Sequence, residues 1–233
     1  MKVAIVTAIY GDYEYPKPLP PELKDIDVVA YMYSDSEQVC HEAAEMGYFA
    51  ILDEMDDEDS IFYVATPMLR AKYWKTHPTS AAPYRDASIW LDGSMIITVP
   101  GDVFVDNCLK ALGDDDISFT PHPLRTCIYP EASVTAALAR YSDCAPVKQV
   151  EFYRNVVGHP VNGGLMASGA FTVRHTDETE HWGKLWWDEC NNWTYQDQLS
   201  LPVITRLMTM EGRLKWNMNM PWAAWWGIAE HGR

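Results

Sequence analysis

Three short polar sequences stand directly after apolar runs, and they are the first candidates for chemistry: Tyr10-Gly11-Asp12, Ser34-Asp35 and Asp92-Gly93-Ser94. The third is the most informative. Asp92 and Ser94 offer a carboxylate and a hydroxyl oxygen, which suit Mg²⁺ or Mn²⁺ that takes its other ligands from phosphate. Gly93 would let the backbone or phosphate of another molecule approach closely. Asp-Gly is also common in turns, so this motif alone indicates a metal site and a plain turn equally well.

Basic residues are scarce, yet several fall close together. The chain has 18 Lys and Arg against 33 Asp and Glu, and Arg70, Lys72 and Lys75 lie within six positions, with Arg85 nearby. Lys72 and Lys75 are three apart, so a helix would place them on one face. Such a face suits a phosphate-bearing ligand. The spacing is equally typical of a solvated amphipathic helix.

Two later segments also group residues that can do chemistry. The irregular segment 121–131 brings His122, Arg125, Tyr129 and Glu131 together, and loops of this composition often carry function. Asp197, between two glutamines, lies at a predicted helix start. It is either a first-turn acid that favours the helix dipole or a carboxylate that faces a substrate.

The elements that must position these residues alternate between strand and helix in the first half of the chain. Apolar runs predict strands at 2–9, 27–33, 48–52, 87–91 and 117–120. Ser36 and Thr66 are predicted to cap helices over 37–46 and 66–75, and a further helix is predicted near 103–112. The alternation predicts an α/β fold, with a mostly parallel sheet and helices on both faces. In such sheets, ligands bind beyond the carboxyl ends of the strands.

The second half has longer helical patterns. Helices are predicted over 131–141, 147–157 and 178–191, a strand over 163–173, and a helix over 196–207 that is interrupted at Pro202. No linker separates the halves, so we predict one domain over residues 1–233. The length of 233 residues suits one large α/β domain. The 10 Trp and 13 Tyr are typical of a ligand cleft or of a Trp-rich core.

Composition limits the class of partner. The net charge of −15 repels a phosphate backbone at long range, so nothing favours nucleic acid as a general partner. The acidic runs 53–60 and 113–116 are typical of solvated loops and lack the spacing of a calcium loop. Five scattered cysteines indicate neither a disulfide framework nor structural zinc, which fits a reducing compartment. The N-terminal apolar run is too short for a signal peptide or a membrane span, so we predict a cytoplasmic protein.

Six segments, in order along the chain, carry a resemblance to a known family. They are VAIVTAIYGDYE, RAKYWKTHP, SIWLDGSM, HPLRTCIYPEA, QVEFYRNVVGHPVNGGLMASG and YQDQLSLP, which together span most of Val3 to Pro202. They resemble the glycosyltransferase-like domain family that was once catalogued as of unknown function, with members in plant Golgi proteins, bacteria and phages. The resemblance implies a GT-A (Rossmann-like) fold, a Mn²⁺ or Mg²⁺ ion and a nucleotide-sugar donor, with UDP-sugars as the first expectation. It divides the chain into a nucleotide-binding half, 1–120, and an acceptor-binding half, 121–233.

The resemblance also implies roles for particular residues. The expected nucleotide-binding residues are Thr7, Ala8, Tyr10, Asp12, Asp35, Arg70, Lys72 and Lys75. The Asp-x-Asp metal motif of these enzymes falls on Asp92-Gly93-Ser94, where serine replaces the second acid, and His231 matches a C-terminal histidine that completes the metal shell. Asp197 and Gln198 match an Asp-Gln pair that faces the sugar. The expected acceptor or sugar contacts are His122, Arg125, Gly164 and Ser168.

The implied activity is metal-dependent transfer of a hexosyl or pentosyl group to a hydroxyl acceptor, with a glycan expected. The cation and the basic residues would neutralise the leaving diphosphate. Asp197 would take the acceptor proton in an inverting enzyme or steady the oxocarbenium-like sugar in a retaining one. Ser94 leaves open a non-catalytic binder of nucleotide sugars or carbohydrates. A transferase acting on hydroxylated bases of phage DNA, in which nucleic acid enters only as acceptor, and a two-carboxylate glycoside hydrolase are further alternatives. The oligomeric state is left open.

Overall fold

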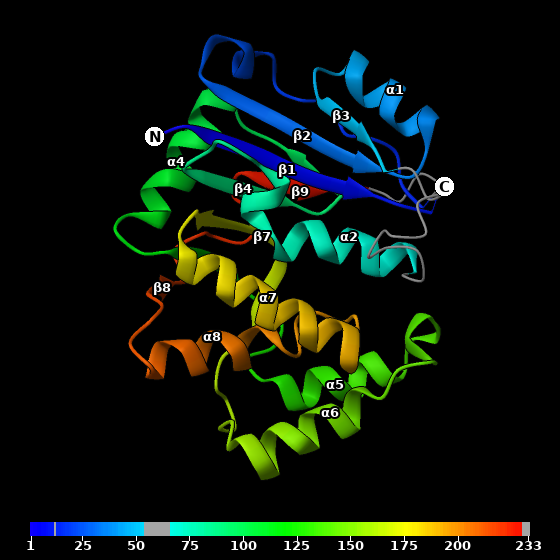
Figure 1. The fold of residues 1–233 in the computed structure, drawn as a ribbon, viewed down its shortest axis with the longest axis vertical. Helices are drawn as coiled ribbons and strands as arrows, with labels where there is room; N and C mark the ends of the chain where they lie inside the picture. The colour runs from blue at the N-terminus through cyan, green and yellow to red at the C-terminus, as the bar shows by residue number, and fades with distance from the viewer. Residues whose placement is uncertain (12, 54–65, 230–233) are drawn as a thin grey trace.

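A seven-stranded sheet runs through the middle of the molecule (Figure 1). The computed structural model describes residues 1–11, 13–53 and 66–229. The strand order is β3-β2-β1-β4-β7-β6-β8. The strands are β1 (Val3–Ile9), β2 (Val28–Ser34), β3 (Phe49–Leu52), β4 (Ala87–Leu91), β6 (Ile117–Pro121), β7 (Met166–Arg174) and β8 (Trp216–Asn217). A second, two-stranded sheet pairs β5 (Met95–Ile97) with β9 (Trp226–Ile228) in antiparallel fashion.

Strand direction brings several strand ends to one edge. Strands β3, β2, β1 and β4 are mutually parallel, and β7 runs antiparallel between β4 and β6. Consequently β6 and β8, which pair in parallel, run in the same direction as β4. The carboxyl ends of β1, β2, β3, β4 and β6 therefore meet at the same edge, where β7 begins. The prediction of a mostly parallel sheet is confirmed.

Helices cover both faces of this sheet, as predicted. The helices are α1 (Glu37–Glu45), α2 (Pro67–Thr76), α3 (Pro78–Ala81), α4 (Gly101–Leu112), α5 (Ile128–Ala136), α6 (Pro146–Phe152), α7 (Asp177–Asn192) and α8 (Leu201–Met210), with short turns η1 (Pro21–Asp25), η2 (Ala139–Tyr141) and η3 (Tyr153–Val157). Alternate residues of β1 face opposite cores: Val6 packs with residues of α7 and α8, and Ile5 packs with residues of η1 and α4. In Figure 1, α5 and α6 lie at the lower end of the molecule, beyond α7 and α8.

Side-chain caps explain where three helices begin. Ser36, Thr66 and Thr176 each accept a hydrogen bond from a backbone N–H in the first turn of α1, α2 and α7. These N–H groups have no partner inside the helix, so each cap satisfies a donor that would otherwise need water. The predicted caps at Ser36 and Thr66 are confirmed.

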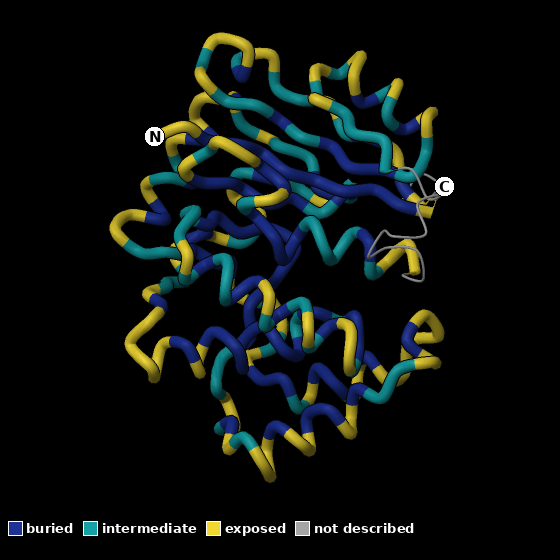
Figure 2. Tube along the Cα trace, in the orientation of Figure 1, coloured by how far each residue is buried: buried dark blue, intermediate teal, exposed yellow. Residues whose placement is uncertain are grey.

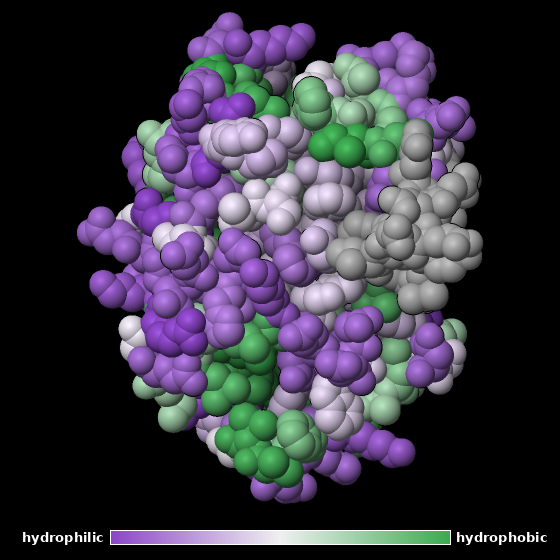
Figure 3. Space-filling view, in the orientation of Figure 1, coloured by the Kyte–Doolittle hydropathy of each residue, from purple (hydrophilic) through white to green (hydrophobic). Residues whose placement is uncertain are grey.

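Much of the aromatic excess fills the core. Trp182 and Trp186 of α7 are completely buried against the sheet, and Trp226 of β9 is 1% exposed. Figure 2 shows the buried strands in the middle and the exposed residues on the outer turns and helices. The face seen in Figure 3 is mostly hydrophilic, with apolar patches both near its upper end and in its lower, helical half. All five cysteines are free, and no helix within the described ranges is long and apolar enough to cross a bilayer.

The predicted helix over 196–207 is wrong in its first half. Helix α8 begins at Leu201, and Pro202 lies in its first turn rather than interrupting it. A first-turn N–H has no intrahelical partner, so proline is tolerated there. Residues 196–200 form a turn, in which the backbone N–H of Leu201 donates to the carbonyl of Asp197 at 3.0 Å. Asp197 therefore precedes the helix, and its interpretation as a first-turn acid is wrong.

Candidate active site

Asp92 reaches the carboxyl edge of the sheet directly after β4. Its backbone N–H donates to the carbonyl of Gly169 on β7 at 2.8 Å, which fixes the strand end. Its Oδ1 accepts from Trp90 Nε1 at 2.7 Å and from Lys75 Nζ at 3.0 Å. The side chain is 34% exposed. The fold thus anchors one carboxylate oxygen of Asp92 and leaves the group open to solvent.

Two lysines of α2 join Asp92 to Asp197. Lys75 Nζ lies 2.7 Å from Asp197 Oδ2, and Lys72 Nζ lies 2.7 Å from the same oxygen. The other oxygen of Asp197 accepts from Ser168 Oγ at 2.8 Å. Lys75 and Asp197 are buried, whereas the side chain of Lys72 is 19% exposed. We call Lys72, Lys75, Asp92 and Asp197 the lysine–aspartate cluster.

The charges in this cluster outweigh the effect of burial. Burial alone would raise the pKa of Asp197, but the ammonium groups of Lys72 and Lys75 hold it well below its usual range. Burial alone would lower the pKa of Lys72, but Asp197 and Asp92 raise it above its usual value. Asp197 is therefore ionised and Lys72 is charged throughout the physiological pH range.

The packing and the backbone conformation explain two glycines at this edge. A Cβ on Gly93 would lie 2.7 Å from Cγ1 of Ile9, so a side chain there would clash with β1. The small residue between Asp92 and Ser94 is thus required by the sheet, and ligand approach is not needed to explain it. Gly164, in the turn before β7, has a φ of +97°, which other residues rarely adopt.

Ser94 has two neighbours that bear on a metal. Its side chain lies near the hydroxyl of Tyr13, whose pKa is raised by burial and by the nearby charge of Asp92. Its backbone carbonyl accepts from the N–H of Ala229 at 2.8 Å, next to the pairing of β5 with β9. His231 and Asp12, both expected site residues, lie outside the described residues.

The described residues offer a minimal metal site. Within 1–11, 13–53 and 66–229, no three His, Cys, Asp or Glu side chains form a metal-binding group. Among the described residues, the side-chain donors to Asp92 are Lys75 and Trp90, and both use Oδ1, so within this part of the chain Oδ2 is the oxygen left for a cation. One carboxylate oxygen fits a Mg²⁺ or Mn²⁺ ion that takes most of its ligands from phosphate and water.

The ends of β1, β2 and β3 form a separate polar network. Tyr10 is buried, donates its hydroxyl to Asp53 Oδ2 at 2.8 Å and accepts from Trp74 Nε1 at 2.6 Å. Burial, followed by the charge of Asp53, raises the pKa of Tyr10 above its usual value. Asp35 Oδ1 accepts from the backbone N–H of Gly11 at 3.0 Å. Asp53, the first acid of a run that is expected to be a solvated loop, is therefore paired.

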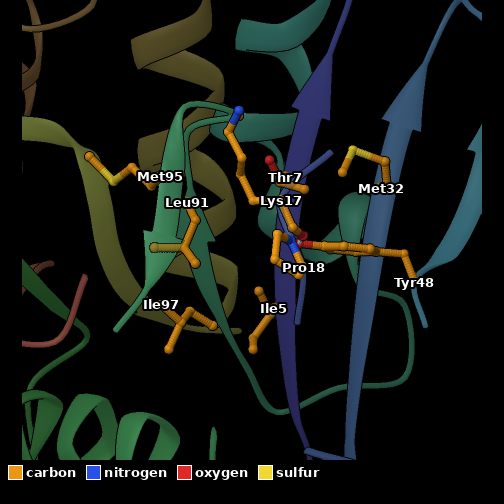
Figure 4. Close-up of a pocket in the computed structure, with 10 residues that line it drawn as sticks. Ile5, Thr7, Lys17, Pro18, Met32, Tyr48, Leu91, Met95 and Ile97 are labelled. Carbon is orange, nitrogen blue, oxygen red and sulfur yellow. Dashed lines mark hydrogen bonds between the residues drawn. The ribbon is translucent and has the colours of Figure 1, made fainter. Parts of the chain in front are cut away.

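The structure does not bring the side chains of Thr7 and Ala8 to these groups. Adjacent strand residues point to opposite faces, and Ala8 is buried in the core under α2 and α7. Thr7 lines a cavity of about 10 Å³ with Ile5 and Met32 (Figure 4), which has room for about one water molecule. Arg70 is also buried, at 4% exposure.

A second buried carboxylate, Glu131, forms a separate cluster. Glu131 accepts from Arg125 Nε and, on its other oxygen, from Gln196 Nε2 at 3.2 Å. The same amide nitrogen of Gln196 donates to Gln198 Oε1 at 3.0 Å. The amide oxygen of Gln196 accepts from the hydroxyl of Tyr141 at 2.7 Å. With His122, these residues form what we call the arginine–glutamate cluster: His122, Arg125, Glu131, Tyr141, Gln196 and Gln198.

His122 holds the turn that carries Arg125. Its Nδ1 accepts from the backbone N–H groups of Leu124 at 3.2 Å and Arg125 at 3.0 Å. Burial lowers the pKa of His122; Glu131 opposes this, and Arg125 adds to it. The ring is therefore neutral at pH 7, with its proton on Nε2. Because Gln196 and Asp197 are neighbours in sequence, one turn joins the two clusters.

Sequence reasoning missed Trp90, Tyr13 and Tyr141. Trp90 carried a usable signal, because residues two apart on a strand share a face and Trp90 therefore points to the same side as Asp92. Tyr13 and Tyr141 had none, since Tyr13 lies in an irregular segment and Tyr141 in the short element η2, and only the folded chain places them at the site.

Comparisons with known proteins identify the fold class. The apo structure of mouse xyloside xylosyltransferase 1 aligns with 93% of this chain and 84% of its own, at 9% identity and a TM-score of 0.49. The apo structure of the WbbM bifunctional glycosyltransferase aligns with 93% of this chain and 38% of its own, at 10% identity and a TM-score of 0.51. The likeness to WbbM supports a GT-A-type fold, as expected. No curated protein matches this chain in sequence.

A family profile decides the class of protein. The profile described as "TOD1/MUCI70, glycosyltransferase-like domain" matches residues 79–223, which is more than half of the chain and includes Asp92, Glu131 and Asp197. The matched region also holds Arg125 and Ser168. It contains the whole arginine–glutamate cluster and both acids of the lysine–aspartate cluster, whereas Lys72 and Lys75 lie before it. The chain is a glycosyltransferase by fold and family, and it belongs to the TOD1/MUCI70 glycosyltransferase-like domain family.

Proposed function

We propose that the protein transfers a sugar from a nucleotide-sugar donor, first of all a UDP-sugar, to a hydroxyl acceptor, with a divalent cation at Asp92. One observation carries the proposal. At the carboxyl edge of the sheet, an open carboxylate oxygen of Asp92 lies beside two lysines that are already oriented by Asp197. This is the edge at which open α/β sheets bind ligands.

His231 and Ser94 are the proposed partners of Asp92 in holding the cation. The N–H of Ala229 is bonded to the carbonyl of Ser94. A chain advances by at most about 3.6 Å per residue, so a histidine two positions further on stays within reach of the motif. When bound, the cation would neutralise negative charge that develops on the leaving diphosphate.

Lys72 and Lys75 are proposed to act on the same charge. Lys72 is the more accessible of the two and keeps its proton because its pKa is raised. Its ammonium group can therefore stabilise a departing phosphate oxygen without a prior change of protonation. Lys75 is buried and holds Asp92 and Asp197 at fixed separation. Arg70, Tyr10, Asp12 and Asp35 remain predicted nucleotide contacts.

Asp197 is proposed to position the lysines. A general base works best when its pKa lies near the operating pH. The lowered pKa of Asp197 makes it a weak proton acceptor. We therefore favour the retaining role, in which Asp197 stays ionised and steadies the sugar, with Gln198 beside it. Sugar transfer to a glycan is the proposed outcome. A location in the cytoplasm and the division into halves at residue 120 stay predictions.

The test replaces Asp92 by asparagine. Asp92→Asn keeps an oxygen for Trp90 and Lys75 but removes the charge, so we expect transfer to fall roughly a hundredfold. We also expect the thermal shift given by UDP with Mn²⁺ to disappear, because a ligand that binds only the native state raises its midpoint. Asp106→Asn, in a surface ion pair with Lys110, is the matched control and should change neither. Full transfer and a full shift in Asp92→Asn would refute the proposal.

The second candidate is a binder without turnover. Ser94 favours it, because serine replaces an acid and leaves the motif with one carboxylate. The two candidates separate in one assay of the wild-type protein. A thermal shift with UDP and Mn²⁺, without release of UDP from any UDP-sugar over a long incubation with glycan acceptors, would support the binder. A nucleic-acid acceptor remains the weaker alternative, since the net charge of −15 opposes it.

A further inference from the structure

We propose that the acceptor carries an anionic group, a carboxylate or a phosphate on a sugar, and that Arg125 in the arginine–glutamate cluster binds it. This inference rests on the proposed function, because it names the class of acceptor for the same site. Its observations are nevertheless separate from those that concern the donor, since no residue of the lysine–aspartate cluster contacts Arg125.

Arg125 is held ready before any ligand arrives. Its Nε donates to Glu131, which is 3% exposed and is itself fixed by Gln196. The backbone N–H of Arg125 donates to His122, so the turn is pinned as well as the side chain. The side chain is 27% exposed. A guanidinium that is fixed at Nε presents its two remaining nitrogens in a set direction, which lowers the entropy lost on binding.

The hydrogen bonds of the cluster leave donors without partners. Its carboxylate and amide oxygens and its ring acceptor each already accept a hydrogen bond: both oxygens of Glu131, the amide oxygens of Gln196 and Gln198, and Nδ1 of His122. Three sets of donors have no acceptor among the described residues, namely the two terminal nitrogens of Arg125, the amide nitrogen of Gln198 and the Nε2 of His122. His122 Nε2 lies 4.0 Å from Glu131, which is too far for a hydrogen bond.

This imbalance selects the chemistry of the ligand. A group that binds here must bring acceptors, and it gains little from bringing donors. Carboxylates and phosphates carry acceptors only, and their paired oxygens match the two terminal nitrogens of an arginine. A sugar hydroxyl brings a donor along with its acceptor, so it fits the cluster less well.

Local charge and position agree with this choice. Between residues 121 and 165 the chain has four Lys or Arg and three Asp or Glu, so this segment has a net charge of +1, whereas the remainder carries −16. Burial raises the pKa of Tyr141 and the charge of Lys72 lowers it, so this member of the arginine–glutamate cluster also lies near the lysine–aspartate cluster. An anionic group on Arg125 would thus stand close to the proposed sugar-transfer site.

The experiment measures binding of three monosaccharides to the full chain by calorimetry: glucuronate, glucose 6-phosphate and neutral glucose. We expect one or both anionic sugars to bind more tightly than glucose. The test variant is Arg125→Gln with Glu131→Gln, which removes both charges and leaves no buried carboxylate unpaired. It should weaken anionic-sugar binding roughly tenfold to a hundredfold, the loss expected for charged hydrogen bonds, and leave glucose binding unchanged.

Arg154→Gln is the matched control, because the Arg154 guanidinium lies 4.1 Å from the ring of Tyr129 in the same half of the chain. It should bind all three sugars as the wild type does. The thermal shift with UDP and Mn²⁺, measured on the wild type and on every variant, separates the two proposals. Absence of the shift in the wild type counts against the donor site, and its persistence in the double variant shows an intact fold. Three results would overturn the anion site: equal binding of glucose and the anionic sugars, unchanged binding in the double variant, or no binding of either anionic sugar.

Discussion

The lysine–aspartate and arginine–glutamate clusters each hold one buried carboxylate and balance its charge differently. In the first, Asp197 receives two lysine ammonium groups on a single oxygen, both at 2.7 Å. In the second, Glu131 receives one arginine and one neutral amide on separate oxygens. One turn, containing Gln196 and Asp197, joins the two arrangements.

The difference indicates what each cluster is suited to bind. Lysine is a compact point charge, so two of them on one oxygen concentrate positive charge, which a leaving diphosphate needs. Arginine presents donors in a fixed plane, so the Arg125 pair is directional and suits recognition of one group on an acceptor. In the lysine–aspartate cluster we therefore expect the largest effects from substitutions that remove a charge. In the arginine–glutamate cluster we expect them from substitutions that change the orientation of the hydrogen-bond donors.

The largest expected effect comes from removing Lys75. Lys75→Met removes one of the positive charges that balance Asp92 and Asp197. Because Lys75 is fully buried, water cannot easily replace it. We expect the free energy of unfolding to fall by about 3–5 kcal/mol. Arg125→Met should cost less, because the 27% exposed side chain lets water reach Glu131. Urea unfolding of both variants measures the difference.

A double variant gives the control. Adding Asp197→Asn to Lys75→Met removes one of the uncompensated charges, so part of the stability should return. The proposed contrast between the clusters would be wrong in either of two cases. The first is that the double variant loses as much stability as Lys75→Met and Asp197→Asn lose together when each is measured alone. The second is that Lys75→Met and Arg125→Met lose the same amount.

Local sequence signals explain which parts of the fold were predictable. The helix caps at Ser36 and Thr66 and the apolar runs of β1 and β4 depend on neighbouring residues, so the sequence alone indicates them. The short strands β5, β8 and β9 have two or three residues and no periodicity. They form only because distant segments pair with them, as β5 does with β9, and the sequence pattern contains no sign of this.

The same distinction applies to the candidate site. Lys72 and Lys75 could be placed on one helix face from their spacing, and Asp92 could be placed at a strand end. Their contact with Asp197 could not be predicted, since Lys72 and Asp197 are 125 positions apart. The pairing of Arg125 with Glu131 spans only six positions, yet the sequence grouped the residues without giving the bond, because the turn between them is irregular.

The second prediction concerns acid. Both ring nitrogens of His159, which lies between η3 and β7, are buried and have no hydrogen-bond partner among the described residues. Burial, with the charge of Arg206, lowers the pKa of this histidine to about 4, against about 6.5 in an unfolded chain. Above about pH 6.5 the histidine is neutral in both states and does not reduce the free energy of unfolding. As the pH falls from there toward the folded pKa of about 4, the unfolded chain binds a proton that the folded protein does not, so stability is lost. Between pH 7.5 and 5, the loss is about 2 kcal/mol.

The His159→Leu variant and hydrogen exchange test this. The wild type should lose about 2 kcal/mol more of its unfolding free energy than His159→Leu does over the same pH change. Amide exchange at pH 5, corrected for the intrinsic rate, should accelerate first in α5 and α6, whereas peptides of β1 and β4 near the charged and paired lysine–aspartate cluster should stay protected. An equal pH response in the two proteins, or earlier exchange in β1 and β4, would contradict the prediction.

The smallest expected effect compares two single hydroxyls. Ser168 donates to the charged Asp197 at 2.8 Å, and Tyr141 donates to the neutral amide of Gln196 at 2.7 Å. Ser168→Ala and Tyr141→Phe each remove one oxygen. We expect about 1.5–3 kcal/mol for the bond to a charge and about 0.5–1.5 kcal/mol for the bond to an amide. Urea unfolding at pH 7.5 measures both, and an equal or reversed order would mean that the lysines, rather than Ser168, satisfy Asp197, so that its second oxygen would be free to face the sugar.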